Sequence, residues 1–153
     1  MPIVKLLKDS VIEPLLVMAW RSNPLVYQGL LKQTAPLQWE NHIDWWRKDR
    51  AWEHWLIVYG EGIYERPVGQ VNVVNLDTDC PEIGYFIGEI PLWGKGIATD
   101  AVSDVIDWCK EHGYKKICAD VRQDNPASVK LLKKLGFREV EGQDGLQGYL
   151  LEI

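Results

Sequence analysis

The sequence has few cysteines, no long apolar run and no excess of basic residues. Its three cysteines, Cys80, Cys109 and Cys118, form neither a C-x-x-C pair nor an even set, which argues against a zinc site or a disulfide scaffold. We therefore expect free thiols in a reducing cytoplasm and no bound metal. No stretch approaches the roughly 18 apolar residues of a membrane span. The net charge of −5 argues against nucleic acid as the main partner.

Length and composition predict a single globular domain over residues 1–153. The chain is 46% hydrophobic and 25% charged, a mixture that excludes disorder, collagen and coiled coil. A chain of this length buries roughly 70% of its unfolded surface, so its core needs no disulfide or metal. The first ten residues lack the apolar segment of a secretory signal. No repeat, low-complexity tract or linker divides the sequence.

Patterns of apolar and turn residues predict seven strands and four helices. Ser10 and Glu13 have the spacing of a capping box, whereas Asn125 with Pro126 begins the last helix and Gly136 ends it. Residues 21–36 contain at most a short helical turn. Central hairpins and two later β–α–β crossovers indicate a mixed α/β sheet with helices on both faces. The predicted strands are 3–7, 54–59, 68–76, 81–88, 115–121, 137–141 and 147–153, and the helices are 11–20, 37–48, one opening at 94–96 and ending near 111, and 125–135.

The most informative segment is a loop of small residues between a strand and a helix, Gly94-Lys-Gly-Ile-Ala-Thr99. The first amides of the helix have no partner within it and carry the positive end of its dipole. Gly94 and Gly96 let an anion approach the backbone, and Ala98 and Thr99 keep the surface low. These features predict a seat for phosphate or pyrophosphate. A simple turn followed by a helix start fits the same residues.

Two nucleotide-binding templates fail on this loop. A Walker A loop has four residues between its first Gly and its Gly-Lys, but five residues separate Gly88 from Gly94, and Gly96 stands where Ser or Thr is needed. A dinucleotide fingerprint needs a third glycine where Thr99 stands. The failures disfavour a plain nucleotide-binding protein, which would bind ATP or NAD but not coenzyme A.

A third template, the [QR]-x-x-G-x-[GA] loop of the GNAT N-acetyltransferases, matches at Gly96 and Ala98, with Trp93 in place of Gln or Arg. The segment Asn125-Pro-Ala-Ser128 … Lys134-Leu-Gly-Phe137 resembles the N-x-x-S/A … K-x-G-F helix of that family. The strand Glu82-Ile-Gly-Tyr and the loop W-G-K-G-I-A-T resemble the RimJ/RimL branch. The predicted order of elements also follows the family, so the chain resembles a GNAT domain over nearly its whole length.

The resemblance implies a fold and a cosubstrate. The fold is a mixed, mostly antiparallel sheet of six to seven strands, with helices on both faces and a splayed central strand pair. The cosubstrate is acetyl-CoA, used without a metal. Family motifs place the cofactor-binding residues at Phe86, Ile87, Gly94, Lys95, Gly96, Ile97, Ala98, Thr99, Asn125, Ser128 and Lys134.

Acetyl transfer to an amine needs a group that accepts a proton, because an amine with a pKa near ~10 is mostly protonated at neutral pH. By resemblance to RimL-like enzymes we expect Glu82 to be this base, although a solvated carboxylate at a strand end is an equal alternative. Ser128 corresponds to a serine suggested to protonate the leaving thiolate, and we favour a hydrogen bond to CoA instead. Leu132 stands where many family members have a tyrosine general acid.

The acceptor side is expected where tryptophans gather, since six of the eight lie between Trp20 and Trp55. The W-R-x-N and H-x-x-W elements also resemble acetyltransferases of nucleotide-linked amino sugars. Aromatic faces suit sugars and bases, but the same stripe could be core. His42 is an alternative base, because histidine titrates near neutrality. The expected substrate-binding residues are Trp20, Arg21, Asn23, Tyr27, His42 and Trp46.

The function predicted from these residues is acetyl-CoA-dependent N-acetylation of a primary amine by direct attack in a ternary complex. The acceptor is a small molecule such as a nucleotide-linked amino sugar, or a protein N-terminus. The alternative is a non-catalytic CoA- or sugar-binding module on the same fold, which Leu132 makes worth keeping. We expect a monomer or a homodimer in the cytoplasm, without nucleic-acid or membrane partners.

Overall fold

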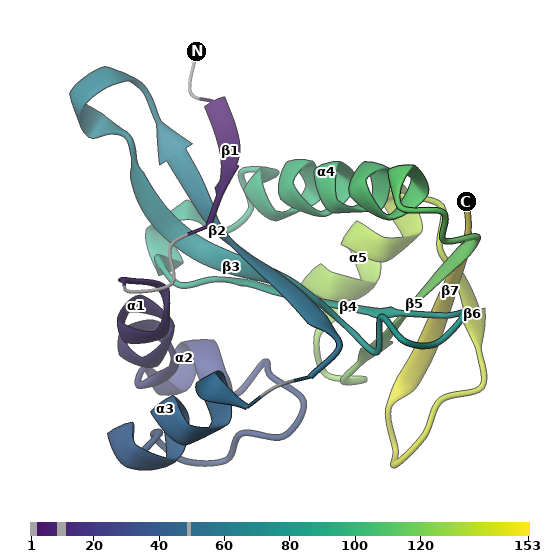
Figure 1. Cartoon of the computed structure of the whole chain (residues 1–153), viewed down its shortest axis with the longest axis horizontal. Helices are drawn as coiled ribbons and strands as arrows, with labels where there is room; N and C mark the ends of the chain where they lie inside the picture. The colour runs from purple at the N-terminus through teal and green to yellow at the C-terminus, as the bar shows by residue number, and fades with distance from the viewer. Residues whose placement is uncertain (1–2, 9–11, 49) are drawn as a thin grey trace.

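A computed structural model describes residues 3–8, 12–48 and 50–153. A seven-stranded sheet in the order β1-β2-β3-β4-β5-β7-β6 forms the centre of the molecule (Figure 1). Its strands are β1 (Ile3–Leu7), β2 (Trp52–Gly60), β3 (Arg66–Val74), β4 (Glu82–Ile87), β5 (Lys116–Val121), β6 (Arg138–Val140) and β7 (Gln147–Glu152). Among the described residues every neighbouring pair is antiparallel except β4 with β5.

Helices cover both faces of the sheet (Figure 1). One side carries α1 (Ile12–Arg21), α2 (Pro24–Tyr27) and α3 (Trp39–Arg47), and the other carries α4 (Ile97–Glu111) and α5 (Pro126–Lys134). Two 3₁₀ turns, η1 (Gly62–Tyr64) and η2 (Ile90–Leu92), complete the elements of residues 3–8, 12–48 and 50–153. The predicted fold class is confirmed. No helix among the described residues combines the length and apolar character that a membrane crossing requires.

The long helix α4 forms because its apolar residues recur on one face. Ala101, Val102, Val105, Ile106 and Cys109 are all buried, which is the spacing of a helix that packs on a sheet. They join β-strand side chains that project from the same side of the sheet, so the main core lies between the sheet and the pair α4 and α5.

The start of α5 follows the predicted chemistry. Asn125 is its N-cap, with Oδ1 accepting from the backbone N–H of Ser128 at 3.3 Å, and Pro126 occupies the first turn. The short helical turn expected within residues 21–36 is α2, which Asn23 caps by accepting from the N–H of Leu25 at 3.0 Å. The predicted capping box at Ser10 lies outside the described residues.

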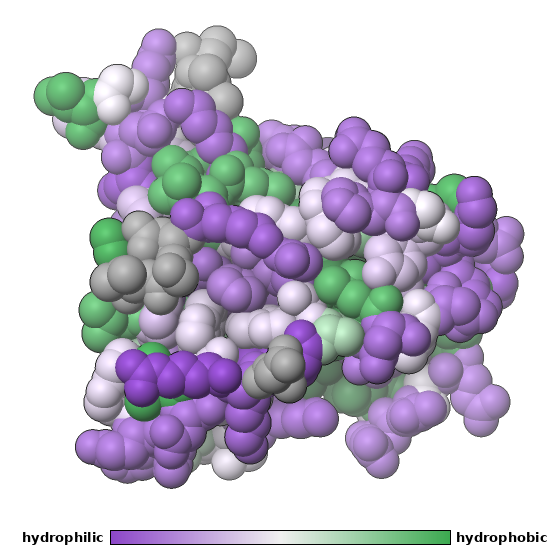
Figure 2. Space-filling view, in the orientation of Figure 1, coloured by the Kyte–Doolittle hydropathy of each residue, from purple (hydrophilic) through white to green (hydrophobic). Residues whose placement is uncertain are grey.

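The tip of the β2–β3 hairpin projects from the body of the molecule (Figure 1). Ile63 is 93% exposed and Tyr64 is 72% exposed at this tip. Figure 2 shows apolar colour there, whereas hydrophilic side chains cover much of the rest of this face. The second strand of the hairpin returns into the sheet, where Val68, Val71 and Val73 are fully buried.

The two central strands β4 and β5 separate almost as soon as they meet. Within the described residues they share one registered pair, Glu82 with Cys118, and the N–H of Cys118 donates to the carbonyl of Pro81 at 2.9 Å. By contrast, β4 pairs with β3 along its whole length, as β5 does with β7. The expected splayed strand pair is therefore present.

Helix α1 reaches the end of β4 through close contact between Trp20 and Gly88. A Cβ at residue 88 would overlap the indole of Trp20, which also lies edge-on to Phe86 with 6.1 Å between ring centroids. Because glycine leaves room for the ring, this contact joins the helical side of the molecule to the splayed strands.

We expect Gly88→Ala to lower the free energy of unfolding by about 2 kcal/mol, because the added methyl group overpacks the indole. Gly29→Ala is the matched control, since its Cβ would meet atoms no closer than 3.6 Å, and it should change stability by less than about 0.5 kcal/mol. Urea denaturation measures the free energy of unfolding of both variants. Equal stability of the two variants would contradict this account of the Trp20 contact.

Candidate active site

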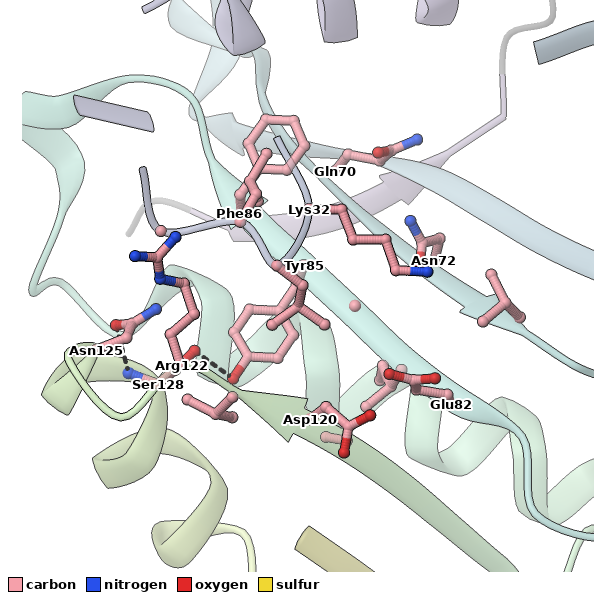
Figure 3. A pocket seen from close by; sticks show the side chains of 18 of the residues that line it. Lys32, Gln70, Asn72, Glu82, Tyr85, Phe86, Asp120, Arg122, Asn125 and Ser128 are labelled. Carbon is pink, nitrogen blue, oxygen red and sulfur yellow. Dashed lines mark hydrogen bonds between the residues drawn. The ribbon is translucent and has the colours of Figure 1, made fainter. Parts of the chain in front are cut away.

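A cavity of about 330 Å³ opens beside the separating strands, with lining residues from the α1–α3 segment and from the start of α5. Figure 3 shows side chains from several elements directed toward it. Its lining comes from Arg21 and the loop Gly29, Leu30, Leu31 and Lys32; from Trp45 of α3; from Gln70, Asn72 and Val74 of β3; from Glu82, Ile83, Gly84, Tyr85 and Phe86 of β4; and from Ala119, Asp120, Val121, Arg122, Asn125 and Ser128.

The register of β3 and β4 sets the wall of this cavity. Gln70 lies opposite Phe86, Asn72 opposite Gly84, and Val74 opposite Glu82. Because side chains alternate along a strand, Val71 and Val73 point into the opposite core. At the centre of the wall, Gly84 has no side chain, and a Cβ there would lie 2.9 Å from Oδ1 of Asn72. The side-chain amide of Asn72 therefore packs over Gly84.

Two carboxyl groups face each other where β4 and β5 begin to separate. Glu82 starts β4, and Asp120 lies on β5. Burial raises the pKa of the Glu82 carboxyl, and the hydrogen-bonded Asp120 carboxylate raises it further, whereas Lys32 acts in the opposite direction. Glu82 therefore holds its proton to higher pH than an exposed glutamate, which suits a general base that works near neutrality.

Two hydroxyl groups meet on the α5 side of the cavity. The Tyr85 hydroxyl lies 2.9 Å from Oγ of Ser128 (dashed in Figure 3). Burial raises the pKa of Tyr85 to about 12, so the phenol stays protonated across the physiological range. Leu132, at the usual tyrosine position of α5, is fully buried in the core, and Tyr85 of β4 instead brings a phenol to the cavity.

The N-terminus of α4 has the geometry of an anion seat. Gly94 and Gly96 have positive φ angles of 78° and 80°, and no side chain within the described part of the chain caps the helix. A Cβ at either glycine would meet nothing within 4 Å, so the space beside both glycines is open. Uncapped amides at the positive end of a 15-residue helix suit a phosphate group.

Trp93 fixes this loop to the end of β4. Its indole Nε1 donates to the carbonyl of Ile87 at 2.9 Å. The tryptophan that replaces the family's usual Gln or Arg therefore holds the loop beside the strand. Of the other residues predicted to bind the cofactor, Phe86, Asn125 and Ser128 line the cavity, and Lys134 is exposed on α5.

Most of the predicted acceptor residues are not among those that line the cavity. Only Arg21 belongs to the lining, and its Nε donates to Oε1 of Gln33 at 2.7 Å. Trp20 packs on Gly88, and Asn23 caps α2. Tyr27 ends α2 and is half-buried. An acceptor contact for these residues stays a prediction.

His42 and Trp46 lie within an aromatic cluster of α3 and β2. His42 is 3% exposed, with its Nε2 2.8 Å from the carbonyl of Pro14. Burial lowers the pKa of His42 below its usual value, and the ring joins α3 to α1. Trp46 packs edge-on against His54 and Trp52. In this part of the chain Trp45 reaches the cavity.

Several polar residues of the cavity that were not predicted from the sequence lie on buried strands. Gln70 and Asn72 alternate with Val71 and Val73, and Asp120 stands between Ala119 and Val121. A polar residue at alternate positions of a strand with buried neighbours is a signal that could have identified them. The remaining missed residues are Lys32, Tyr85 and Arg122.

Comparison with known proteins agrees with this geometry. A family model described as an acetyltransferase (GNAT) domain matches residues 5–138. An uncharacterized protein of Methanocaldococcus jannaschii is 45% identical over 139 residues, which are 91% of this chain and 28% of that protein. The chain therefore belongs to the GNAT acetyltransferase domain family, and it spans less than a third of this relative.

Solved structures support the same fold. A crystal structure of a domain from Methanocaldococcus jannaschii superposes with a TM-score of 0.89 at 42% identity, covering 100% of this chain and 99% of that one. The aminoglycoside acetyltransferase AAC(6')-Ib in complex with coenzyme A has a TM-score of 0.77 at 13% identity, covering 99% and 95%. At that identity the second likeness shows the fold alone.

Proposed function

We propose that this protein transfers the acetyl group of acetyl-CoA to a primary amine by direct attack in a ternary complex. The observation that carries the proposal is the single registered pair between β4 and β5. Beyond it the facing strand edges are free to pair with an extended chain, and the open amides of α4 follow at the end of β4. An extended chain that ends in an anion would fit this arrangement, and the pantetheine arm of CoA with its pyrophosphate is such a chain.

The cosubstrate is held by backbone groups more than by side chains. Residues 94–99 surround the pyrophosphate, where the uncapped helix terminus and two glycines of positive φ support an anion. At the free edge of β4 the N–H of Ile87 pairs with pantetheine, since the Ile87 carbonyl accepts from Trp93 and the backbone of Phe86 faces Gln70 of β3. Asn125 and Ser128 approach the arm from α5, and Lys134 serves the 3′-phosphate.

Glu82 is the base. A protonated amine cannot attack, and Glu82 is a carboxyl in the cavity whose pKa burial and Asp120 raise. It accepts the proton of the ammonium group, directly or through water, and releases it to solvent before the free amine attacks. The backbone of the splayed strand supplies a donor for the oxyanion.

The Tyr85–Ser128 hydroxyl pair supports an enzyme over a non-catalytic module. Leu132 removes the usual hydroxyl of α5, but the paired hydroxyls line the cavity and can donate to the leaving thiolate. Because a thiol pKa near ~8.5 lies well below the pKa of about 12 of Tyr85, the pair stabilises the thiolate by hydrogen bonds, and the proton reaches the sulfur from solvent.

The shape of the cavity favours a small acceptor over a protein N-terminus. A volume of about 330 Å³ beneath Trp45 and the loop 29–32 suits a metabolite. Basic groups of Arg21, Lys32 and Arg122 line the same space, which supports an amine that carries phosphate, as a nucleotide-linked amino sugar does. The E-I-G-Y strand supports assignment to the RimJ/RimL-like branch. We also propose that the enzyme acts in the cytoplasm, as a monomer or a homodimer.

An acceptor screen by mass spectrometry tests the activity. With acetyl-CoA present, we expect a gain of one acetyl group on UDP-glucosamine or D-glucosamine, and a weaker gain or none on spermidine and on a peptide with a free N-terminus. Acetylation of the peptide alone would favour the protein acceptor. Tight CoA binding with no acetylation of any amine would favour the non-catalytic module.

The pH profile tests the base. Because Glu82 acts as a carboxylate, the rate should rise with pH through its raised pKa, below the separate limb of the amine near pH ~10. We expect Glu82→Gln to lower kcat about a hundredfold and to abolish the lower limb. Asp120→Asn removes the electrostatic repulsion between the Asp120 and Glu82 carboxylates. The pKa of Glu82 should fall, and the lower limb of the profile should move to lower pH. Glu65→Gln, at an exposed glutamate paired with Lys5, is the control. An unchanged profile in Glu82→Gln would refute the assignment.

A pair of glycine variants tests the anion seat. Gly96 and Gly113 lie at opposite ends of α4, with φ angles of 80° and 87° and open space around each. Alanine should therefore lower stability by about 1 kcal/mol at both positions. We expect CoA, but not ATP or NAD, to raise the melting temperature, and only Gly96→Ala to reduce that rise. Equal loss of the CoA effect in Gly113→Ala would show that the seat is elsewhere.

A further inference from the structure

A buried glutamine lies in the wall of the cavity between apolar neighbours. Gln70 of β3 pairs with Leu56 of β2 and with Phe86 of β4, and 4% of its surface is exposed. Burying an amide in such a place is unfavourable unless its polar ends are hydrogen-bonded. Each end of the Gln70 amide therefore needs a partner.

The nitrogen end has its partner in Glu13. Nε2 of Gln70 donates to Oε1 of Glu13 at 3.4 Å, and Nδ1 of His54 lies 2.8 Å from the same oxygen. Glu13 is 0% exposed, and its Oε2 has no partner among the described residues. A carboxylate only accepts hydrogen bonds, so it selects the NH₂ end of Gln70 and leaves the carbonyl end pointing elsewhere.

The carbonyl end of the Gln70 amide belongs to a residue that lines the cavity. No hydrogen bond to this Oε1 is formed within residues 3–8, 12–48 and 50–153, and the atom is not among the fully buried polar atoms that lack a partner. Figure 3 shows Gln70 beside Phe86 at the wall of the cavity. The oxygen is an acceptor whose orientation a buried charge fixes in advance.

We propose that Gln70 binds and positions the nucleophilic amine, and that Glu13 is the positioning residue that orients Gln70. The inference rests on the proposed function, in which the pantetheine arm lies along the free edge of β4 beside Phe86. Since Gln70 lies directly opposite Phe86, an amine that attacks the thioester there is adjacent to Oε1. One N–H of the amine donates to this oxygen and directs the nitrogen lone pair toward the carbonyl carbon.

The acetyl transfer requires no proton transfer to or from Gln70. The nitrogen lone pair forms the C–N bond, the C–S bond breaks with its electron pair on sulfur, and the amine proton goes to Glu82. A neutral carbonyl suits the positioning role because it stabilises an ammonium ion less than a carboxylate would. The amine is thereby held without being kept in its unreactive, charged form.

Steady-state kinetics on the whole chain test the pair. We expect Gln70→Met to lower kcat/KM about tenfold for each panel amine that the wild type acetylates, with the KM for acetyl-CoA and the pH limb of Glu82 unchanged. Glu13→Gln should give a smaller loss in the same parameter, because an amide at residue 13 accepts either orientation of Gln70. The double variant should match Gln70→Met alone, since Glu13 acts through Gln70.

Gln147→Met is the matched control, because Gln147 donates to the carbonyls of Val140 and Gly148 and does not line the cavity, so this variant should leave kcat/KM unchanged. If Gln70→Met does not fold, Gln70→Asn, which withdraws the oxygen by one methylene, should show the same loss. Unchanged kcat/KM in the Gln70 variants, or additive losses in the double variant, would overturn the proposal.

A binding measurement separates this inference from the proposed function. With CoA present, D-glucosamine should shift the side-chain ¹⁵N resonance of Gln70, and Glu13→Gln should weaken that shift. A shift at Gln70 without acetylation of any amine would support the binding role while the proposed activity fails. No shift at Gln70 at saturating D-glucosamine would overturn the inference whatever the enzyme acetylates.

Discussion

The structure depends on backbone groups that the sheet leaves unpaired at its own centre. Each of β4 and β5 is fully paired on its outer side, yet the two share one registered pair with each other. Interior N–H and C=O groups are unfavourable without partners, so the divergence creates a place where water or an added extended chain must bind. Strand addition usually takes place at the edge of a sheet. Here the gap lies in the middle, flanked by Glu82, Asp120, Tyr85 and Ser128.

Much of the fold could be predicted because its signals are local. The N-cap at Asn125, the small residues of 94–99 and the apolar face of α4 each act over one or two helical turns. The order of elements then limits the topology. The divergence of β4 from β5 has no such local signal, because alternation along each strand is the same whether or not its neighbour stays paired. It was expected only because motifs in the flanking segments resemble a known family.

The side chains that line the cavity were harder to predict, because they depend on which side of each element faces it. The tryptophan-rich segment predicted as the acceptor wall mostly packs on itself: the Arg50 guanidinium lies 3.8 Å from the Trp45 ring centroid and 4.0 Å from that of Trp52. Aromatic side chains form core and binding surface equally well. Polar residues in a buried strand are a more informative signal. Gln70, Asn72 and Asp120 are of this kind, and all three line the cavity.

The contrast between Leu132 and Tyr85 shows how a site can keep a chemical group while the element that supplies it changes. Leu132 packs into the core of α5, so no hydroxyl enters from the usual position. Tyr85 projects from β4 and reaches Ser128, whose N–H is already bound by the cap Asn125. The cap fixes the serine, and the serine fixes the phenol beside the gap in the sheet. A motif comparison of α5 alone would therefore suggest a missing group, whereas the packing of β4 against α5 places one within the same cavity.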